Sequence, residues 1–337
     1  MKYLVGIDIG GTKCAVILGA LHNCPQGNTP GKVSGNDETI TILDRVSFPT
    51  EVQKGPGHTI GRIIDSVDLV LSKNSKRAEE ICRIGISCGG PLDSRRGIIL
   101  SPPNLVGWDN IHIAEIIEAK YNVRAKLQND ANACALAEWR FGSGKGFKNV
   151  VFLTFGTGMG AGLILDGRLY SGTNDLAGEV GHIRLDANGP AGYGKAGSFE
   201  GFCSGGGIAQ LARTMVLERL QMGETVSFCD GIDRLDSLNA KVVADAAVSG
   251  DELAMEIFRV SGYYLGKGLS IIIDMLNPEI IIIGGIFSRC RELLWPKAYE
   301  VIRKEALSLS QNVCRVAPAA LGEKIGDYAA LAVAANE

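Results

Sequence analysis

Two stretches of this chain share a strand–glycine–strand layout, and this repeat constrains the fold more than any other feature. In the first, Gly10-Gly11-Thr12-Lys13 joins the apolar segments 3–9 and 14–18. In the second, a turn that begins Gly156-Thr157-Gly158 joins the segments 150–155 and 161–165, at an offset of 146 residues. The match is weak in identity but clear in layout, which indicates an internal repeat of a supersecondary unit.

Both glycine turns lead from strand to strand. A P-loop or a dinucleotide-binding turn leads into a helix, so the turn Gly10–Lys13 is neither. Glycines at a hairpin tip let backbone N–H groups approach a phosphate closely, although a single Gly-Gly turn is explained better as a tight hairpin. Two such tips, one from each copy of the repeated unit, favour phosphate binding over a simple tight hairpin. Asp8 comes just before the first tip, where it is placed to meet a phosphate-bound Mg²⁺ through water.

A second feature is a strand-to-helix junction that carries a carboxylate. Alternating apolar residues over 123–127 predict a short strand, and the Ala-rich stretch after Asp130 predicts a helix that stops at Gly142. Asn129 and Asp130 therefore lie beyond the carboxyl end of a strand, where α/β sheets bind ligands. From this stretch alone, Asp130 is interpreted equally well as the N-cap of the helix or as a catalytic group.

The remaining chain mixes predicted strands and helices. Strands are expected over 39–48, 81–87, 279–283 and 313–316, and helices over 58–71, 208–220, 251–275, 289–307 and 324–335. A further helix around Ile113 is expected to be capped by Asp109 or Asn110. Residues 20–38, rich in Gly, Pro and Asn, are expected to form a long loop.

Charge and composition argue against several classes of function. The formal net charge is −3 and there is no dense Lys/Arg patch, which argues against nucleic-acid binding. No apolar run approaches the length of a membrane span, and the N-terminus has the pattern of a first strand instead of a signal peptide. Nine cysteines without a CxxC pair favour a reducing compartment, so we expect a cytoplasmic protein.

Four further polar residues are candidates for a binding site. Glu179, His182 and Glu200 stand among small and apolar residues, where a polar side chain is costly unless it has a partner. Asn104 lies in a rigid loop between a strand and a helix. An ordinary surface position also explains each of Glu179, His182 and Glu200 when they are taken separately. Turn chemistry also explains Asn104.

Together these motifs resemble the ROK family of bacterial sugar kinases, within the actin/hexokinase-like ATPases. The resemblance covers essentially the whole chain and rests on Asp8-Ile-Gly-Gly-Thr-Lys13, Gly89-Gly-Pro91, Pro103-Asn104, Asn129-Asp-Ala-Asn-Ala133, Gly156-Thr-Gly158, Glu179-Val-Gly-His182, Glu200 with Ser204-Gly205, and Gly284-Gly285. It implies an α/β fold of two ribonuclease-H-like lobes with an interlobe cleft. The N-terminal lobe would comprise residues 1–132 and a C-terminal helix at about 322–337, and the C-terminal lobe residues 133–321.

The resemblance also implies roles for single residues. Asp130 is implied as the general base that takes the proton from the 6-hydroxyl of a sugar. The implied sugar ligands are Gly90, Asn104, Asn129, Glu179, His182 and Glu200. The implied residues around ATP and Mg²⁺ are Asp8, Gly10, Gly11, Thr12, Lys13, Gly156, Thr157 and Gly158, with Gly284 and Gly285 on the adenosine side.

The implied activity is ATP- and Mg²⁺-dependent phosphorylation of an aldohexose, most simply glucose, by a homodimer or homotetramer. N-acetylmannosamine, mannose, allose and fructose remain open as substrates, and so does a sugar-responsive regulator without catalysis. Regulators of the family usually carry an N-terminal DNA-binding domain, whereas here the first strand is expected from Tyr3, and an intact Asp130 favours catalysis.

One departure from the family concerns metal. Many members hold zinc with three cysteines and the histidine that corresponds to His182. The three cysteine positions are Ala191, Tyr193 and Ser198 in this chain, and none supplies a thiolate. We therefore expect no structural zinc, because His182 and the only nearby thiol, Cys203, are two ligands short of a four-ligand site. Burial of the rings of Tyr193 and Phe199 is expected to take the place of the metal.

Overall fold

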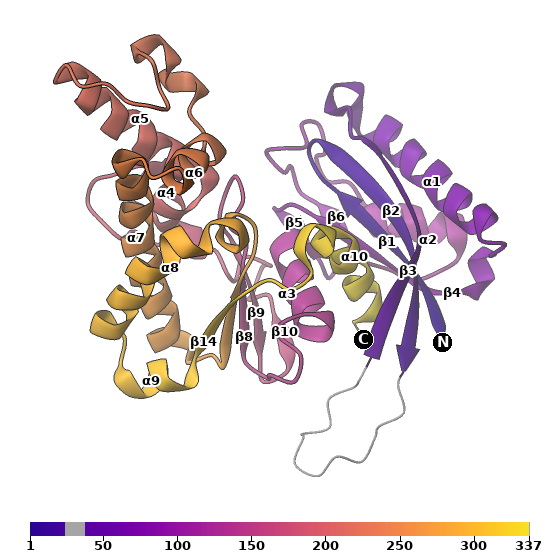
Figure 1. Cartoon of the computed structure of the whole chain (residues 1–337). Helices are drawn as coiled ribbons and strands as arrows, with labels where there is room; N and C mark the ends of the chain where they lie inside the picture. Colours follow the sequence, from indigo (N-terminus) through magenta and orange to yellow (C-terminus); the bar gives the residue numbers. More distant parts are fainter. Residues whose placement is uncertain (24–37, 337) are drawn as a thin grey trace. The chain divides into compact units, whose positions relative to one another are not determined.

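The computed structural model describes residues 1–23 and 38–336 of the chain. The chain divides by its internal contacts into two compact units, both drawn in Figure 1. The first comprises Met1–Phe152, Gly162–Ala177 and Ala320–Glu337, and the second Leu153–Ala161 and Gly178–Ala319. The boundary expected between residues 132 and 133 lies inside the first unit, and that division into lobes stays a prediction.

The first unit contains a five-stranded sheet with the order β3-β2-β1-β4-β7. The strands are β1 (Lys2–Ile9), β2 (Lys13–Asn23), β3 (Glu38–Pro49), β4 (Ile81–Cys88) and β7 (Ala125–Asn129). The first three pair antiparallel, whereas β4 pairs parallel with β1, and β7 parallel with β4. The turn Gly10–Lys13 therefore joins two neighbouring antiparallel strands, as the sequence predicts.

Helices cover both faces of this sheet. Apolar residues of α1 (Gly55–Lys73) and α2 (Ile113–Tyr121) pack with alternate strand residues such as Val5 in one core cluster. Ala330, Leu331 and Ala334 of α10 (Ile325–Ala335) pack with the intervening residues, such as Leu4, in a second cluster. Figure 1 shows α1 and α10 on opposite sides of the strands. Burial on both faces explains the nearly continuous apolar runs of β1 and β4.

The second sheet repeats this topology. Its order is β10-β9-β8-β13-β14, so both sheets place their strands as third, second, first, fourth and fifth along the chain. The strands are β8 (Val150–Leu153), β9 (Ala161–Leu165), β10 (Arg168–Tyr170), β13 (Ile280–Ile283) and β14 (Arg315–Pro318). β9 and β10 pair antiparallel and β13 and β14 parallel, in agreement with the first sheet. The predicted α/β fold with an internal repeat is confirmed.

Short strands and further α-helices complete the two units. The first unit also holds β5 (Leu92–Asp93), β6 (Ile98–Ile99) and α3 (Asp130–Phe141). The second unit holds β11 (Ala191–Gly192), β12 (Lys195–Ala196), α4 (Phe199–Cys203), α5 (Gly205–Gln221), α6 (Ala240–Val248), α7 (Glu252–Leu276), α8 (Ile286–Glu305) and α9 (Ser308–Val313). α7 is the longest of the helices described and buries one apolar stripe that includes Phe258, Leu265 and Leu269.

Three local predictions need correction. β2 continues to Asn23 and β3 begins at Glu38, so the ends of the expected loop 20–38 belong to strands, while residues 24–37 lie outside the described residues. α2 begins after His112 without a side-chain cap, and the Asp109 carboxylate instead accepts a hydrogen bond from the Ser101 hydroxyl. α6 is absent from the predicted helices, since nine residues are too few for an apolar pattern to distinguish a helix from a strand or loop.

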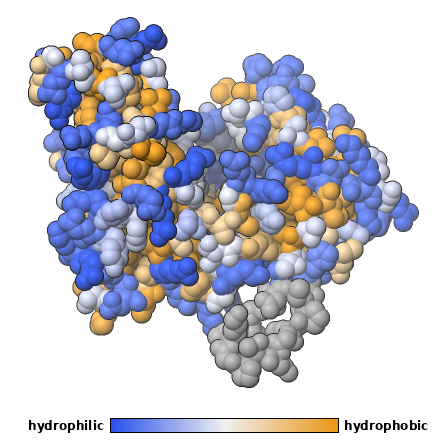
Figure 2. Space-filling view, viewed as in Figure 1, coloured by the Kyte–Doolittle hydropathy of each residue, from blue (hydrophilic) through white to orange (hydrophobic). Residues whose placement is uncertain are grey.

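The surface mixes polar and apolar residues. Figure 2 shows hydrophilic and hydrophobic residues interspersed over the visible face of the molecule. An exposed apolar residue among polar neighbours is ordinary for a folded protein and needs no special explanation. Within the described ranges, no helix has both the length and the apolar character that crossing a bilayer requires.

Candidate functional site

Three parallel strands of the first unit end level with one another. Ile9 of β1 pairs with Cys88 of β4, and Cys88 pairs with Asn129 of β7. The residues that follow these ends, Gly10, Gly89 and Asp130, therefore leave the sheet at the same edge. An ideal Cβ on Gly89 would come 4.0 Å from Asp130 Oδ2. The strand register thus brings the first glycine turn, the Gly89-Gly-Pro91 segment and Asp130 to the ligand-binding edge of the sheet.

At the N-terminus of α3, one residue caps the helix and the next residue carries the carboxylate. Asn129 is the N-cap, and its Oδ1 accepts hydrogen bonds from the N–H groups of Ala131 (2.9 Å) and Asn132 (3.5 Å). Asp130 is the first helical residue, and its Oδ1 accepts the N–H of Ala131 at 2.8 Å. The interpretation of Asp130 as the N-cap is therefore wrong, while Gly142 does follow the last helical residue.

Asp8 and Asp130 are interacting carboxylates at this edge, with Asp8 half-buried and Asp130 exposed to solvent although much protein surrounds it. Burial, together with the negative charges of Asp130 and Asp327, raises the pKa of Asp8 to about 6, against smaller opposing effects of Ser87 and Lys13. Desolvation by the surrounding protein also raises the pKa of Asp130, against the opposing effect of backbone N–H groups. Two neighbouring anions repel each other, so a bound cation would stabilise their ionised forms. The residues therefore fit a divalent cation at Asp8, because Mg²⁺ prefers oxygen ligands.

The first glycine turn packs against the loop that carries Asn104. The turn closes with a hydrogen bond from the N–H of Gly10 to the carbonyl of Lys13 at 3.1 Å. A Cβ on Gly11 would lie only 2.7 Å from the carbonyl oxygen of Asn104, so glycine is required for this close approach. Thr12, Lys13 and Asn104 are exposed beside it. The structure thus brings Asn104 next to the turn, while the roles of both in binding stay predictions.

The sugar-ligand candidates of the first unit also meet. A Cβ on Gly90 would lie 3.2 Å from Nδ2 of Asn129. The Oδ1 of Asn129 is occupied by the helix cap, so its amide nitrogen is the atom that is available to a ligand. Gly90, Asn129 and Asp130 lie together, and Gly11 and Asn104 form a second group at the same sheet edge.

In the second unit Glu200 is the point where three predicted segments meet. Its Oε2 accepts the N–H of Met159 at 2.8 Å, and a Cβ on Gly158 would lie 2.8 Å from the same oxygen. A Cβ on Gly181 would lie 3.2 Å from the Glu200 Cβ, which places the segment from Glu179 to His182 alongside. The second glycine turn, the Glu-Val-Gly-His segment and Glu200 are therefore neighbours.

The start of α5 holds the other side of the second glycine turn. The N–H of Gly205 donates to the carbonyl of Gly156 at 2.8 Å, and the N–H of Gly206 donates to the carbonyl of Thr157 at 3.5 Å. The Ser204 side chain caps α5 by accepting a hydrogen bond from a backbone N–H of its first turn. The Ser204-Gly205 segment, which contributes to the family resemblance, therefore supports the turn through backbone contacts.

The segment Gly284-Gly285 lies beside the second glycine turn. The N–H of Gly284 donates to the carbonyl of Leu153 at 3.0 Å, and the N–H of Ile286 donates to the carbonyl of Phe155 at 2.7 Å. Gly285 has a φ of 61°, and a Cβ there would lie 2.0 Å from the Phe155 carbonyl oxygen. Only glycine fits this position, so the end of β13 and the start of α8 meet the turn by close backbone contact.

The stretch that corresponds to the zinc loop is held by side chains of α7. The Tyr264 hydroxyl donates to Asp186 at 2.8 Å, and the Lys267 ammonium donates to the Leu185 carbonyl at 3.1 Å. Phe199 is completely buried, as expected. Tyr193 is 71% exposed, so the expectation that its ring is buried is wrong. Tyr264 and Lys267 are absent from the predicted residues, because their only signal in the sequence is polar and aromatic character on a largely apolar helix.

Purified protein is expected to contain no stoichiometric zinc, and a strong chelator is expected to leave its Tm unchanged. The reason is the donor set, because Ala191, Tyr193 and Ser198 offer no thiolate beside His182. Elemental analysis and thermal unfolding with and without EDTA provide the measurement. One zinc per chain, lost together with the fold on chelation, would contradict this prediction.

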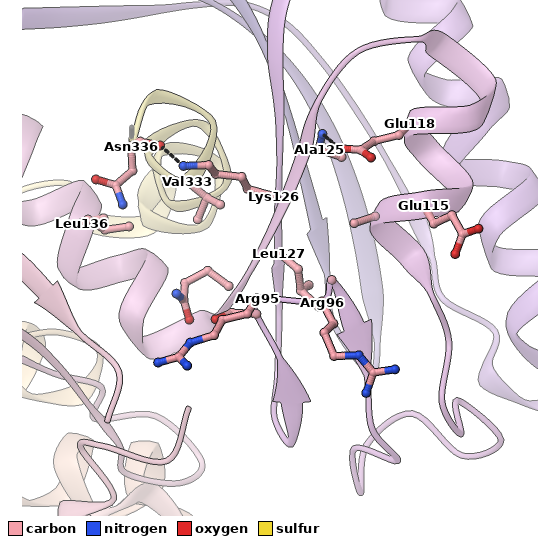
Figure 3. Close-up of a pocket in the computed structure, with 14 residues that line it drawn as sticks. Arg95, Arg96, Glu115, Glu118, Ala125, Lys126, Leu127, Leu136, Val333 and Asn336 are labelled. Atoms are coloured by element: carbon pink, nitrogen blue, oxygen red, sulfur yellow. Dashed lines mark hydrogen bonds between the residues drawn. The ribbon is translucent and has the colours of Figure 1, made fainter. Parts of the chain in front are cut away.

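A cavity of about 440 Å³ lies elsewhere in the first unit, along β7, α2 and the end of α10. None of the predicted site residues lines it. Two of its polar groups are engaged within the protein: Lys126 Nζ donates to the Asn336 carbonyl at 2.7 Å, and the N–H of Ala125 donates to Glu118 at 2.8 Å. Figure 3 shows the guanidinium groups of Arg95 and Arg96 pointing apart. Since these polar groups do not converge on a common point, this cavity is not the candidate site.

Comparison with known proteins adds independent evidence. The family model described as "ROK family" matches residues 4–337. The glucokinase of Halalkalibacterium halodurans is 32% identical over 297 residues, which cover 87% of this chain and 83% of that protein. The DNA-binding transcriptional repressor Mlc of Escherichia coli is 29% identical over 257 residues, which cover 75% of this chain and 61% of the repressor.

A solved structure agrees with these sequence matches. The ROK family glucokinase from Streptomyces griseus, in complex with glucose and AMPPNP, superimposes with a TM-score of 0.73 at 27% identity. The superposition covers 99% of this chain and 100% of the glucokinase. The family model, the curated relatives and the fold therefore agree, and the chain belongs to the ROK family.

Proposed function

We propose that this protein is an ATP- and Mg²⁺-dependent kinase that phosphorylates glucose on its 6-hydroxyl, with Asp130 as the general base. The observation that carries the proposal is the solvent-accessible Asp130 carboxylate at the ligand-binding edge of the sheet, where the strand register also brings Asp8 and the Gly10–Lys13 turn. Membership of a family with ATP-dependent sugar kinases supports the reaction class. The glucokinase names of the relatives support glucose as the first sugar to test.

In the proposed mechanism Asp130 accepts the proton of the 6-hydroxyl as that oxygen attacks the γ-phosphorus of ATP. The bond between the γ-phosphorus and the β,γ-bridging oxygen breaks, and ADP is the leaving group. A carboxylate with a raised pKa is a stronger base than an ordinary one, which suits this step. The backbone N–H groups of the two glycine turns are proposed to hold phosphate oxygens. Phosphoryl transfer depends mainly on positioning and charge neutralisation. Mg²⁺, held through water by Asp8, would supply neutralising charge when bound.

The sugar-binding roles are part of the same proposal. Gly90, Asn104 and Asn129 of the first unit and Glu179, His182 and Glu200 of the second are assigned to sugar hydroxyls. Carboxylates accept strong hydrogen bonds from hydroxyl groups, so two of them suit a substrate with many hydroxyls. Gly284 and Gly285 are assigned to the adenosine side. A homodimer or homotetramer in the cytoplasm is proposed as the working state.

A coupled assay of ATP consumption over a panel of sugars tests the proposal directly. The panel contains glucose, mannose, allose, fructose and N-acetylmannosamine, with Mg²⁺ present. Glucose is expected to give the largest kcat/KM. A larger value for another hexose would change the substrate and keep the reaction. Absence of sugar-dependent ATP consumption with every sugar would reject the kinase and favour a sugar-responsive regulator; a DNA-binding transcriptional repressor is among the relatives.

Replacing Glu200 with Ala is expected to raise the KM for the sugar by about tenfold or more. A site built around hydroxyl hydrogen bonds loses much affinity when one partner is removed. Glu200→Gln keeps the shape of the side chain and is expected to lose less. Steady-state kinetics measure the effect, with Glu218→Ala as the control because Glu218 is an exposed carboxylate of α5. An unchanged KM and kcat for every sugar of the panel would place Glu200 outside the site.

A further inference from the structure

Tyr193 occupies an unusual backbone conformation at the tip of the hairpin formed by β11 and β12. Its φ is +47°, and Gly194 beside it has a φ of +77°. Large side chains rarely adopt positive φ because the Cβ atom approaches the backbone, and such strain persists only where something retains it. Burial of the ring does not hold Tyr193 in this strained conformation, since the side chain is 71% exposed. Glycine would occupy this position without strain.

The ring of Tyr193 contacts the imidazole of His182. The two ring centroids lie 5.3 Å apart at an interplanar angle of 72°, which is an edge-to-face arrangement. Lys195, two residues after Tyr193, donates from Nζ to the backbone carbonyl of His182 at 2.8 Å. The backbone of His182 is thus tied to the hairpin by Lys195, and its side chain meets the hairpin through Tyr193.

The hairpin itself is fixed to the rest of the second unit. The side chain of Gln210 binds Ala191 twice, accepting its N–H at 3.0 Å and donating to its carbonyl at 2.8 Å. A Cβ on Gly192 would lie 2.7 Å from the Glu200 Cβ, so the hairpin packs directly on Glu200. A ring carried by this fixed hairpin is able to restrict the imidazole next to it.

We infer that Tyr193 is a positioning residue whose ring holds the imidazole of His182 in the orientation that binds a sugar hydroxyl. The inference rests on the proposed function, in which His182 is a sugar ligand. A side chain already held in its binding orientation loses less conformational freedom when the ligand arrives, and affinity rises accordingly. The strained backbone of Tyr193 is explained by this role in binding.

A double-mutant cycle measures the coupling between the two rings. Isothermal titration calorimetry without ATP gives the Kd of the best hexose from the panel. Tyr193→Ala is expected to weaken binding about five- to tenfold, and Tyr193→Phe, which keeps the ring, is expected to retain most of the wild-type affinity. In a His182→Ala background, Tyr193→Ala is expected to change Kd by less than about twofold. Additive effects would overturn the inference, because Tyr193 would then act on the sugar independently of His182.

Two controls separate positioning from a general structural role. Tyr299→Ala removes another exposed tyrosine, on α8, and is expected to leave sugar affinity unchanged. Tyr193→Gly removes both the ring and the backbone strain. The Tm of this variant is expected to be unchanged or about 1–3 °C higher than that of the wild type, while its sugar affinity falls. A Tm several degrees lower would show that Tyr193 serves stability, which would overturn the inference.

A measurement without sugar keeps the inference separate from the proposed function. The chain has four histidines, so the side-chain NMR signals of His182 are assignable with a His182→Gln variant. Tyr193→Ala is expected to shift these signals by removing the ring current, whereas Tyr193→Phe retains most of it. Unchanged His182 signals in Tyr193→Ala would overturn the positioning role. Failure of the wild-type protein to bind any hexose would instead reject the proposed function.

Discussion

Replacement of Asp130 by Ala is expected to lower kcat for hexose phosphorylation by about 10²–10⁴-fold, the usual contribution of a general base. Sugar affinity is expected to change much less, since the proton transfer takes place only in the chemical step. The structure supports a chemical role because Asn129, and not Asp130, caps α3. Loss of Asp130 therefore leaves the helix cap intact.

The coupled assay and calorimetric sugar binding together measure the two effects of Asp130→Ala. Asp130→Asn tests the charge with less change of shape, and Asp65→Asn on the exposed face of α1 is the control. Wild-type turnover by Asp130→Ala would exclude this residue as the base. Equal losses of turnover and of sugar binding would indicate a binding role instead of proton transfer.

The same carboxylate sets the expected pH dependence of the wild-type enzyme. The base acts in its ionised form, and desolvation by the surrounding protein raises the pKa of Asp130 above the ordinary value of 3.8. Activity is therefore retained above the raised pKa and lost as pH falls through it. Asp8, whose pKa is raised to about 6, contributes to the same acid limb. A kcat/KM profile that stays flat down to about pH 4, near the ordinary carboxyl value, would contradict these assignments.

Replacement of Gly85 by Ala is expected to destabilise the first unit by about 3 kcal/mol, at the upper end of typical overpacking. A Cβ on Gly85 would lie 2.2 Å from the Ala330 carbonyl oxygen and 2.3 Å from the Ala334 nitrogen. Both are backbone atoms of α10, so the helix must move away from β4. Gly6, which pairs with Gly85 across β1 and β4, faces the same helix.

A matched glycine provides the control for this prediction. Gly61 lies in α1 with nothing within 4 Å of an ideal Cβ, and Gly61→Ala is expected to stabilise the helix by roughly 0.5–1 kcal/mol. Urea unfolding followed by circular dichroism measures both variants, with separate fits if the two units unfold in separate transitions. Equal stability of Gly85→Ala and the wild type would mean that α10 does not pack closely on β4.

The sequence alone determined the repeated strand–turn–strand units and the positions of most strands. Apolar runs separated by glycine turns specify such units through local signals, because side-chain periodicity and turn chemistry act within a few residues. The placement of Asp130 after a strand also followed from such signals. Its role as a base, and the roles of the sugar ligands, rested on the family resemblance and remain to be tested.

The tertiary structure decided what depends on residues far apart in the chain. Asn129 and Asp130 are both good caps, and the backbone entering α3 selects Asn129. Glu200 meets the N–H of Met159 only because the fold brings α4 to the second turn. The exposure and positive φ of Tyr193 depend on how the hairpin is fixed, which no local pattern encodes. Local periodicity specifies elements, whereas packing between distant elements determines which side chains become neighbours.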